Sequence, residues 1–235
     1  MNILVTGGAG FIGKYLVKSL LEKGNSVTIF DNFSNSTKES ISSLVEMGVK
    51  IIEGDITKPL EIINAVKDHE IVIHLAAKIS VSESISNPLE TFRVNVDGTR
   101  NVLAASEKNN VKKLIAASSA AVYGEGSPDV NLTEKSEANP ISPYGESKVK
   151  MEQEIRGFAS KHEINCIILR FFNNNKIKLQ LRKKDPNNVL EENKSLIAHG
   201  RLKLDPSQLE CEWNSKQLPD KLTTTEFLIV KELAK

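Results

Sequence analysis

The sequence predicts an α/β fold built on a doubly wound parallel sheet, followed by a short C-terminal appendage. Three observations lead to this prediction: continuously apolar segments, amphipathic segments that alternate with them, and a glycine-rich turn directly after the first apolar segment. Strands that are apolar throughout are typical of parallel sheets, because helices cover both faces of such a sheet. The 235 residues suffice for one large α/β domain and an appendage.

Six strands and five helical segments alternate along the first three quarters of the chain. The predicted strands cover residues 2–6, 27–30, 49–53, 71–75, 113–117 and 165–170. The first predicted helix begins at Phe11 and ends before Gly24, and a later one begins at Pro59; the others cover residues 38–47, 88–109 and 143–162. The connections are long enough for right-handed crossovers, which indicates a Rossmann-type sheet. The alternation does not resume past residue 173, so we expect domains at 1–173 and 174–235.

Composition and charge argue against several classes of protein. The chain has 31 basic and 30 acidic residues, a balance that gives no reason to expect nucleic acid or an anionic membrane as a partner. Cys166 and Cys211 are too few for a disulfide framework and lack metal-ligand spacing, so no metal site is predicted. No leader and no apolar run of about 20 residues is seen, so the cytoplasm is the expected location.

Three glycines, Gly7, Gly10 and Gly13, lie in the turn between the first strand and the first helix. A turn of this kind lets backbone N–H groups approach a pyrophosphate, and the helix N-terminus adds partial positive charge. The spacing is wider at its front than the common dinucleotide fingerprint, and an ordinary tight turn is the alternative. The position after the first strand, with Asp31 closing the second, favours a dinucleotide site.

Asp31 indicates which dinucleotide is bound. A carboxylate at the end of the second strand can accept both ribose hydroxyls of an adenosine, but it repels a 2′-phosphate. NAD is therefore expected in preference to NADP. His74 has an apolar neighbourhood and is interpreted as a packed structural histidine. The other candidate cofactor contacts beside the glycines and the strand ends are Phe11, Ile12, Asn32, Asp55, Ile56, Leu75, Ala76 and Ala77.

Tyr144 and Lys148 are four residues apart at the start of a predicted helix, and hence on one face of it. An ammonium close to a phenol lowers the pKa of the phenol, which creates a base for a hydroxyl proton near neutral pH. The pair alone occurs often by chance. Ser118 and Ser119 add hydroxyls at the end of the fifth strand, where sheets of this type bind ligands.

Residues 1–173 resemble the extended short-chain dehydrogenases/reductases, in particular the NAD-dependent epimerases and dehydratases, and within them the UDP-glucose 4-epimerase group. The order and spacing of the matching stretches are specific. These stretches are Thr6–Gly13, Asp31–Asn32, Gly54–Ile56, His74–Ala77, Val94–Thr99, Ser118–Gly124, Ser142–Lys148 and Leu169–Asn173.

The resemblance implies a role for each matching polar residue. Tyr144 would be the base, Lys148 the partner that lowers its pKa and binds ribose, and Ser119 the hydroxyl that contacts sugar O4. Asn95 would line the cofactor and sugar region, and Asn173 would meet the phosphates of a nucleotide sugar such as a UDP-hexose. The implied reaction is removal of the O4 proton with hydride transfer from C4 to NAD⁺, followed by return of the hydride to the other face.

Dehydratases of this superfamily carry an acidic pair directly after the hydroxyl residue of the fifth strand. Ala120 and Ala121 occupy those positions here. Elimination of water needs an acid and a base there, so the resemblance favours an epimerase and keeps a 4,6-dehydratase as the alternative.

Residues 174–235 do not resemble the sugar-nucleotide domain that normally follows. Residues 196–235 instead resemble the opening of a response-regulator winged-helix domain, with a short strand-and-turn region, a helix-like end at 223–235 and, before them, a basic helix-like stretch at 176–184. The part that would enter DNA is missing, so no DNA binding is expected. A fusion or truncation is the simplest account, and a divergent tail is the alternative. We expect cofactor binding more firmly than turnover. A homodimer is compatible with the sequence. The rival hypotheses are a non-catalytic NAD-binding remnant and a transcription-factor fragment.

Overall fold

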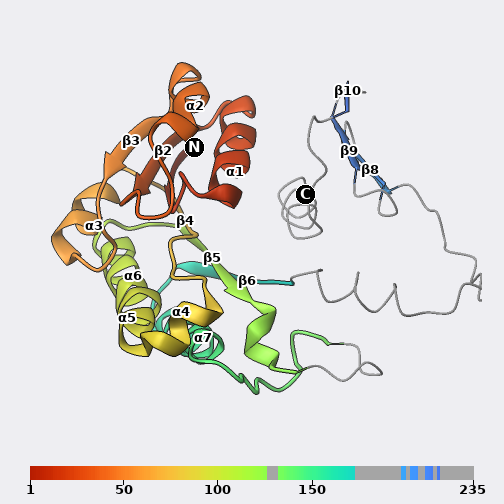
Figure 1. Cartoon of the computed structure of the whole chain (residues 1–235). Helices are drawn as coiled ribbons and strands as arrows, with labels where there is room; N and C mark the ends of the chain where they lie inside the picture. The colour runs from red at the N-terminus through yellow and green to blue at the C-terminus, as the bar shows by residue number, and fades with distance from the viewer. Residues whose placement is uncertain (126–131, 173–196, 200–201, 206–209, 214–215, 218–235) are drawn as a thin grey trace, which may run out of the picture. The chain divides into compact units, whose positions relative to one another are not determined.

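The computed structural model describes residues 1–125 and 132–172, together with the backbone of four short strands between residues 197 and 217. The chain divides into two compact units, Met1–Arg170 and Phe171–Lys235, which are treated separately below (Figure 1). Asn173 and the helix-like stretches expected at 176–184 and 223–235 lie outside the described residues.

The first unit is built on a six-stranded sheet with the strand order β3-β2-β1-β4-β5-β6. This is the doubly wound arrangement that the sequence predicts, and each of the six strands overlaps a predicted segment. The strands are β1 (Asn2–Thr6), β2 (Ser26–Asp31), β3 (Lys50–Glu53), β4 (Ile71–His74), β5 (Lys113–Ser119) and β6 (Asn165–Phe171).

The strand order reverses between β1 and β4. Thr6, at the end of β1, pairs with Phe30 of β2 on one side and with His74 of β4 on the other, and both pairings are parallel. The carboxyl ends of these strands therefore lie side by side. In open α/β sheets this edge, at the point where the order reverses, is where ligands bind.

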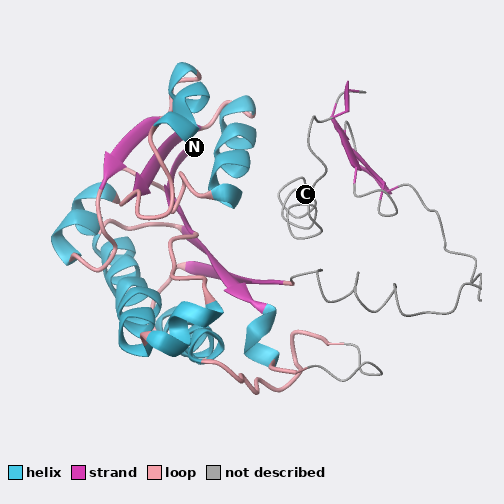
Figure 2. Ribbon diagram, in the orientation of Figure 1, coloured by secondary structure: helices cyan, strands magenta, loops and turns pink. Residues whose placement is uncertain are grey.

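The helices form one layer on each face of the sheet (Figures 1 and 2). On one face α1 packs with α2, and on the other α3, α6 and α7 lie side by side. The helical elements are α1 (Phe11–Glu22), η1 (Glu39–Ile41), α2 (Ser42–Glu46), α3 (Pro59–Ala65), α4 (Val81–Ser86), α5 (Pro88–Phe92), η2 (Arg93–Asp97), α6 (Gly98–Lys108), η3 (Ala120–Tyr123) and α7 (Pro143–Ala159).

Two helical features differ from the prediction. The single helix expected over residues 88–109 is interrupted by the π-helical turn η2, which divides it into α5 and α6. A short helix that the sequence did not predict, α4, precedes it. Its first turn is capped by Ser80, whose hydroxyl accepts a hydrogen bond from the Glu83 N–H at 3.1 Å. The six residues of α4 are mostly polar and too few to show a helical repeat of apolar positions. The Ser80 cap, and not an amphipathic pattern, therefore marks the start of this helix.

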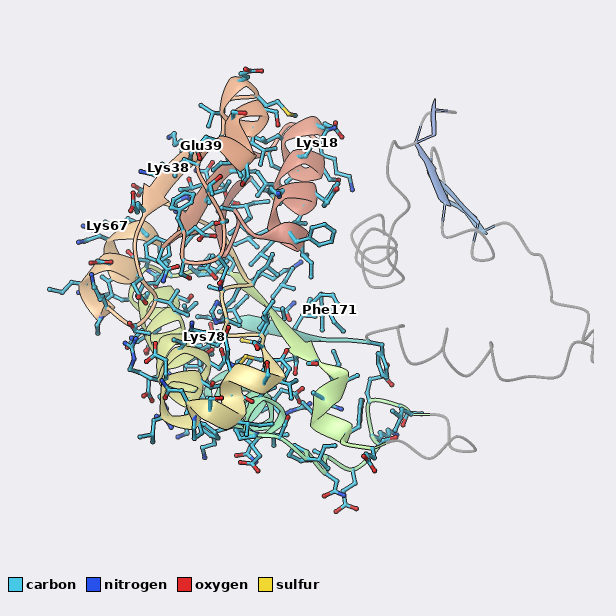
Figure 3. All side chains as sticks on the ribbon, viewed as in Figure 1. Lys18, Lys38, Glu39, Lys67, Lys78 and Phe171 are labelled. Atoms are coloured by element: carbon cyan, nitrogen blue, oxygen red, sulfur yellow. The ribbon has the colours of Figure 1, made fainter. Side chains whose placement is uncertain are left out.

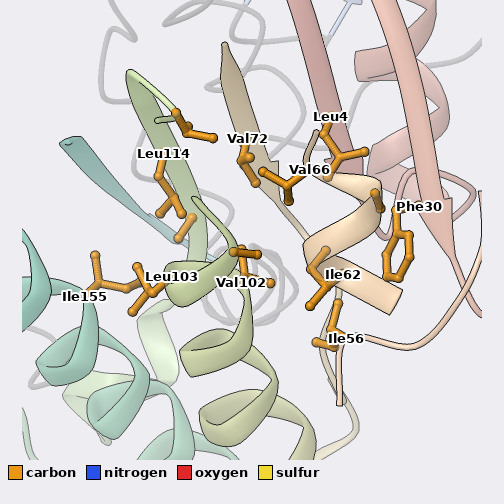
Figure 4. Packing of buried hydrophobic residues seen from close by; sticks show 14 of the residues in the cluster. Leu4, Phe30, Ile56, Ile62, Val66, Val72, Val102, Leu103, Leu114 and Ile155 are labelled. Atoms are coloured by element: carbon orange, nitrogen blue, oxygen red, sulfur yellow. The ribbon is translucent and has the colours of Figure 1, made fainter. Parts of the chain in front are cut away.

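The core lies between the sheet and the layer of α3, α6 and α7 (Figure 4). Each large apolar side chain buried there contributes about 1.5–3 kcal/mol to the free energy of unfolding. The fully buried members include Leu4, Phe30, Val72 and Leu114 from the strands and Ile62, Val102 and Ile155 from the helices.

The second unit contains four short strands that pair antiparallel in the order β10-β9-β8-β7. They are β7 (Ile197–His199), β8 (Leu202–Asp205), β9 (Glu210–Trp213) and β10 (Lys216–Gln217). The strands agree with the strand-and-turn region expected here, and the resemblance to a winged-helix domain stays a prediction. Within the described part of the chain, no helix has the length and apolarity needed to cross a bilayer.

Candidate functional site

The glycine-rich turn runs from the end of β1 to the start of α1. Gly7 has a φ of +70°, and its N–H donates to the Phe30 carbonyl oxygen at 2.8 Å. A Cβ at Gly7 would lie 2.6 Å from the backbone nitrogen of Ala76, and one at Gly13 would lie 2.5 Å from the Gly7 carbonyl oxygen. Both glycines are therefore needed for the close approach of the turn to β4 and to α1.

The N-terminus of α1 opens at this turn. Gly10 occupies the N-cap position without a side-chain hydrogen bond, and no acidic residue lies in the first turn of the helix. The partial positive charge of the first turn is therefore not neutralised by the helix itself. Phe11 is exposed at this end and Ile12 is half-buried, so the two predicted contacts lie where an anion would meet the helix.

Asp31 ends β2 beside the turn. One carboxylate oxygen accepts the Ala9 N–H at 3.0 Å and the other accepts the Phe33 N–H at 2.9 Å. Each oxygen has a second acceptor position, so two ribose hydroxyls can still be bound. Lys38, which lies over the Phe33 ring, is paired with Glu53 at 2.6 Å and so adds little positive charge that would favour a 2′-phosphate.

Asp55 follows β3 and is held in one orientation. One carboxylate oxygen accepts hydrogen bonds from both the N–H and the hydroxyl of Thr57, each at 2.8 Å, and the other lies 3.4 Å from the Asn32 amide nitrogen. Burial raises the pKa of Asp55, but the Thr57 and Asn32 hydrogen bonds and the Arg93 charge outweigh burial and hold it below its usual value. The side chain of Ile56 is in the core, so a cofactor contact by this residue would use its backbone.

The end of β4 is fixed by a chain of hydrogen bonds through His74. The Leu75 N–H donates to the Thr6 carbonyl oxygen at 3.0 Å, and the Ala76 N–H donates to the Thr6 hydroxyl at 3.3 Å. His74 is buried, with Nδ1 2.7 Å from the Thr6 hydroxyl and Nε2 3.0 Å from the Thr99 hydroxyl. Burial first, and the charge of Lys148 second, lower the pKa of His74 to about 3. The neutral, fully bonded ring confirms its interpretation as a structural histidine.

The two serines that end β5 have different surroundings, as expected for neighbours on opposite faces of a strand. Ser118 is buried and donates its hydroxyl hydrogen bond to the Glu152 carboxylate at 2.6 Å. Ser119 is half-buried, accepts the Ala121 N–H at 3.1 Å and lies close enough to the Tyr144 phenol to lower its pKa. Ser119, the serine chosen from the sequence, is therefore the one next to Tyr144.

Lys148 lies one turn after Tyr144 on α7 and is buried. Its ammonium donates to the Ala117 carbonyl oxygen of β5 at 2.9 Å and lies 6.0 Å from the centroid of the Tyr144 ring. Burial lowers the pKa of Lys148 to about 8, and the Glu152 carboxylate acts in the opposite direction. The predicted pair is thus brought together at the carboxyl edge of the sheet.

The net shift of the pKa of Tyr144 is upward, opposite to the downward shift expected from Lys148. Burial raises the pKa of Tyr144 above its usual value, and only the hydrogen bond from Ser119 lowers it. The sequence reveals the spacing of the two residues but not how far the phenol is removed from water, and here the loss of hydration is the larger effect.

Asn95 lies in η2, where both hydrogens of its amide nitrogen and one acceptor position of its oxygen are bonded within the protein. Its oxygen accepts the Lys78 N–H at 2.8 Å, and its nitrogen donates to the Lys78 carbonyl oxygen and to the Ser147 hydroxyl, both at 2.9 Å. Asn95 therefore ties α7 to the loop after β4. Lys78, which this loop carries, is labelled in Figure 3. Its predicted contact with cofactor or sugar stays a prediction.

Two residues next to this site were missed from the sequence. Glu152, one turn beyond Lys148 on α7, accepts two hydrogen bonds from Arg170 at the end of β6. The spacing of four from Lys148 was the available signal for Glu152. Nothing in the sequence indicates that Arg170 lies against it, because that contact joins two elements through the fold.

Together the fold and the site define a nucleotide-binding α/β domain with a tyrosine, a lysine and a serine close together at the carboxyl edge of its sheet. Residues 3–188 match the NAD dependent epimerase/dehydratase family, and the chain belongs to this family. The resemblance seen in the sequence is confirmed.

Known relatives support the same assignment. UDP-glucose 4-epimerase of Yersinia enterocolitica is 41% identical over 181 residues, which cover 74% of this chain and 53% of that protein. UDP-glucose 4-epimerase of Thermotoga maritima, solved with UDP-glucose, has a TM-score of 0.67 at 35% identity and shares 72% of this chain and 55% of its own. A double mutant of the dTDP-glucose 4,6-dehydratase DesIV of Streptomyces venezuelae, solved with NAD and DAU bound, has a TM-score of 0.69 at 26% identity, with coverages of 72% and 55%. The chain spans about half the length of the curated relatives it matches.

Proposed function

We propose that this chain binds NAD and carries the proton-transfer residues of a nucleotide-sugar 4-epimerase, of the type that interconverts UDP-glucose and UDP-galactose. One observation carries the proposal. Ser119, Tyr144 and Lys148 gather at the carboxyl edge of the sheet, the same edge at which the glycine turn and Asp31 lie.

The residues present fit NAD. The glycine turn and the uncapped start of α1 suit a pyrophosphate, and the free acceptor positions of Asp31 suit the two hydroxyls of an adenosine ribose. Asp55 and Asn32 lie next to Asp31 and would meet the adenosine. Bound there, NAD supplies a reversible hydride acceptor for C4 of the sugar.

The chain's own side chains would move the proton. Tyr144 takes the proton of the sugar O4 hydroxyl and later returns it, while Ser119 orients O4 by a hydrogen bond. Lys148 places a positive charge beside the phenol, which favours the phenolate, and reaches the ribose hydroxyls. Asn173 would meet the phosphates of the nucleotide sugar.

An epimerase is favoured over a 4,6-dehydratase by the residues after Ser119. Ala120 and Ala121 form the start of η3, and the carbonyl oxygen of Ala121 packs against Gly145 of α7. Methyl groups at these positions offer neither acid nor base for the elimination of water. The higher identity to the epimerases than to the dehydratase supports the same choice.

The coverage of the relatives supports one alternative, an NAD-binding protein without turnover. Orientation of the substrate supplies about 7–11 kcal/mol of the barrier in reactions of this kind. Residues 1–173, the proposed cofactor domain, would bind NAD by themselves, whereas turnover also needs groups that grip the nucleotide half of the substrate. A homodimer and a cytoplasmic location stay predictions.

Calorimetric titration with NAD and with NADP, followed by a coupled assay with UDP-glucose and UDP-galactose, tests the proposal. We expect binding of NAD in preference to NADP, and any turnover to disappear in the Tyr144→Phe variant. Binding without turnover would support the alternative. A folded chain that does not bind NAD would exclude both.

A further inference from the structure

Glu152 and Arg170 form an ion pair that is removed from water. The exposed fraction of the Glu152 side chain is 5% and that of the Arg170 side chain is 14%. Arg170 donates from Nε to one Glu152 oxygen at 2.8 Å and from Nη2 to the other at 2.6 Å. Burial of two charges is costly even when they are paired, so a pair in this position invites a role beyond stability.

Each member of the pair holds a segment next to the proposed active site. Glu152 accepts the Ser118 hydroxyl at 2.6 Å, and Ser118 is the neighbour of Ser119. Arg170 donates to the Tyr123 hydroxyl at 2.7 Å, and that hydroxyl donates to the Thr133 carbonyl oxygen at 2.8 Å. The pair therefore fixes both ends of the short segment from Ser118 to Tyr123.

Glu152 also lies one helical turn from Lys148 on the same face of α7. The groups around the Lys148 ammonium come from four elements: the Ala117 carbonyl of β5, His74 of β4, Tyr144 and Glu152 of α7, and, behind Glu152, Arg170 of β6. His74 is neutral at working pH, and Arg156 touches Glu152 only at 3.4 Å from a largely exposed side chain. Glu152 is thus the one anionic group that acts on the ammonium among the described residues.

We propose that Glu152 is a positioning residue that keeps Lys148 charged inside the protein, and that Arg170 sets how much of the Glu152 charge reaches Lys148. The inference rests on the proposed function only for the role of Lys148 as the cation beside Tyr144. Lys148 is buried without a direct ion pair in the described structure, so its charge depends on a carboxylate close by. Arg170 keeps Glu152 ionised and at the same time offsets its charge.

Titration of the Lys148 amine tests this without NAD and without turnover. Protein labelled with ¹³C at lysine Cε is titrated by NMR, and the Lys148 resonance is assigned by its loss in Lys148→Met. In Glu152→Gln, which keeps an acceptor for Ser118, we expect the pKa of Lys148 to fall by about one unit or more from its value near 8. In Arg170→Met, the unpaired carboxylate should raise it.

Glu154→Gln is the matched control, because Glu154 lies on the same helix but pairs with Arg100 at 2.7 Å on the outer side. The pKa of Lys148 should not change in this variant. If Glu152→Gln does not fold, the double variant Glu152→Gln/Arg170→Met removes both charges together, and its Lys148 pKa should be lower than that in Arg170→Met.

An unchanged pKa of Lys148 in folded Glu152→Gln, or in the double variant compared with Arg170→Met, would overturn the inference and leave the pair a purely structural contact. The proposed function is tested separately, by NAD binding of the unmodified chain. A failure of the Lys148 titration test therefore does not contradict the proposed function, and a failure to bind NAD does not contradict the role of Glu152.

Discussion

The Lys148 ammonium lies over the ring of Tyr144, with Nζ 6.0 Å from the ring centroid, while it is anchored to the Ala117 carbonyl oxygen at 2.9 Å. The Ala117 carbonyl of β5, and not the phenol, therefore holds the ammonium close to the Tyr144 ring. Burial opposes charge on both groups, since it lowers the pKa of Lys148 and raises the pKa of Tyr144. The protonation states of Lys148 and Tyr144 thus depend on the balance between burial and the nearby polar and charged groups.

Replacement of Tyr144 by phenylalanine should abolish proton transfer and preserve the fold. The ring beneath the ammonium is retained, whereas the hydroxyl that exchanges the proton is lost. Turnover of UDP-galactose, if measured in the unmodified chain, should fall by about 10²–10⁴-fold with NAD affinity little changed. A coupled assay and calorimetry check this, and full activity in the variant would exclude Tyr144 as the proton carrier.

Gly7→Ala should destabilise the protein much more than Gly24→Ala, although φ is positive at both positions, +70° and +77°. A Cβ at Gly24 meets nothing within 4 Å, so only backbone strain of about 1–2 kcal/mol applies. A Cβ at Gly7 would also collide with the backbone of Ala76, which adds about 1–3 kcal/mol. Urea unfolding of both variants measures the difference, and equal losses would contradict the close packing of the turn against β4.

Asp31→Asn should weaken NAD binding and reduce the discrimination against NADP. The amide keeps one acceptor oxygen but loses the charge, and hydrogen bonds to a charged group contribute about 1.5–3 kcal/mol. We expect the dissociation constant for NAD to rise by about 10–100-fold. Asp68→Asn, in an exposed turn before β4 at the other edge of the sheet, is the control and should bind NAD normally. Unaltered affinity in Asp31→Asn would remove Asp31 from the cofactor site.

The stability of the protein should fall on acidification through the titration of His74. The pKa of His74 is lowered from 6.5 to about 3 by burial and, less strongly, by the charge of Lys148. Between these values the unfolded chain binds the extra proton and the folded chain does not, so its contribution is complete above pH 6.5 and is lost as pH falls toward 3. The slope is at most about 1.4 kcal/mol per pH unit.

Urea unfolding of the unmodified chain and of His74→Gln from pH 7 to pH 4 checks this expectation. The variant should be less stable at pH 7, because the hydrogen bonds to Thr6 and Thr99 are disturbed, but should lose less stability on acidification. Identical slopes in the two proteins would show that His74 does not titrate on unfolding.

Local patterns sufficed for the strands, for the glycine turn and for the pairing of Tyr144 with Lys148, because these depend on residues close in sequence. The family resemblance singled out Ser119 from its neighbour Ser118. The alternation of side chains along β5 agrees with this choice, because Ser118 contacts Glu152 and Ser119 lies near Tyr144. The helix over residues 88–109 was right in extent but wrong in continuity. An apolar period does not reveal a single extra residue in a turn.

What local patterns do not reveal are effects of burial and contacts between distant elements. The pKa of Tyr144 is raised and not lowered, because burial removes the phenol from water. Glu152 and Arg170 are 18 residues apart and lie on a helix and a strand, and no spacing rule links them.

The π-helical turn η2 places one residue more in its turn than a regular helix would. Arg93, at its start, donates to the Thr57 hydroxyl at 2.8 Å, whereas Asn95, two residues later, reaches Ser147 of α7. Deletion of one residue from η2 would restore an ordinary helix, but it would rotate everything before the deletion by about 100° against everything after it. The extra residue therefore sets the rotation between α5 and α6, so that Arg93 bonds to Thr57 while Asn95 bonds to Ser147 of α7.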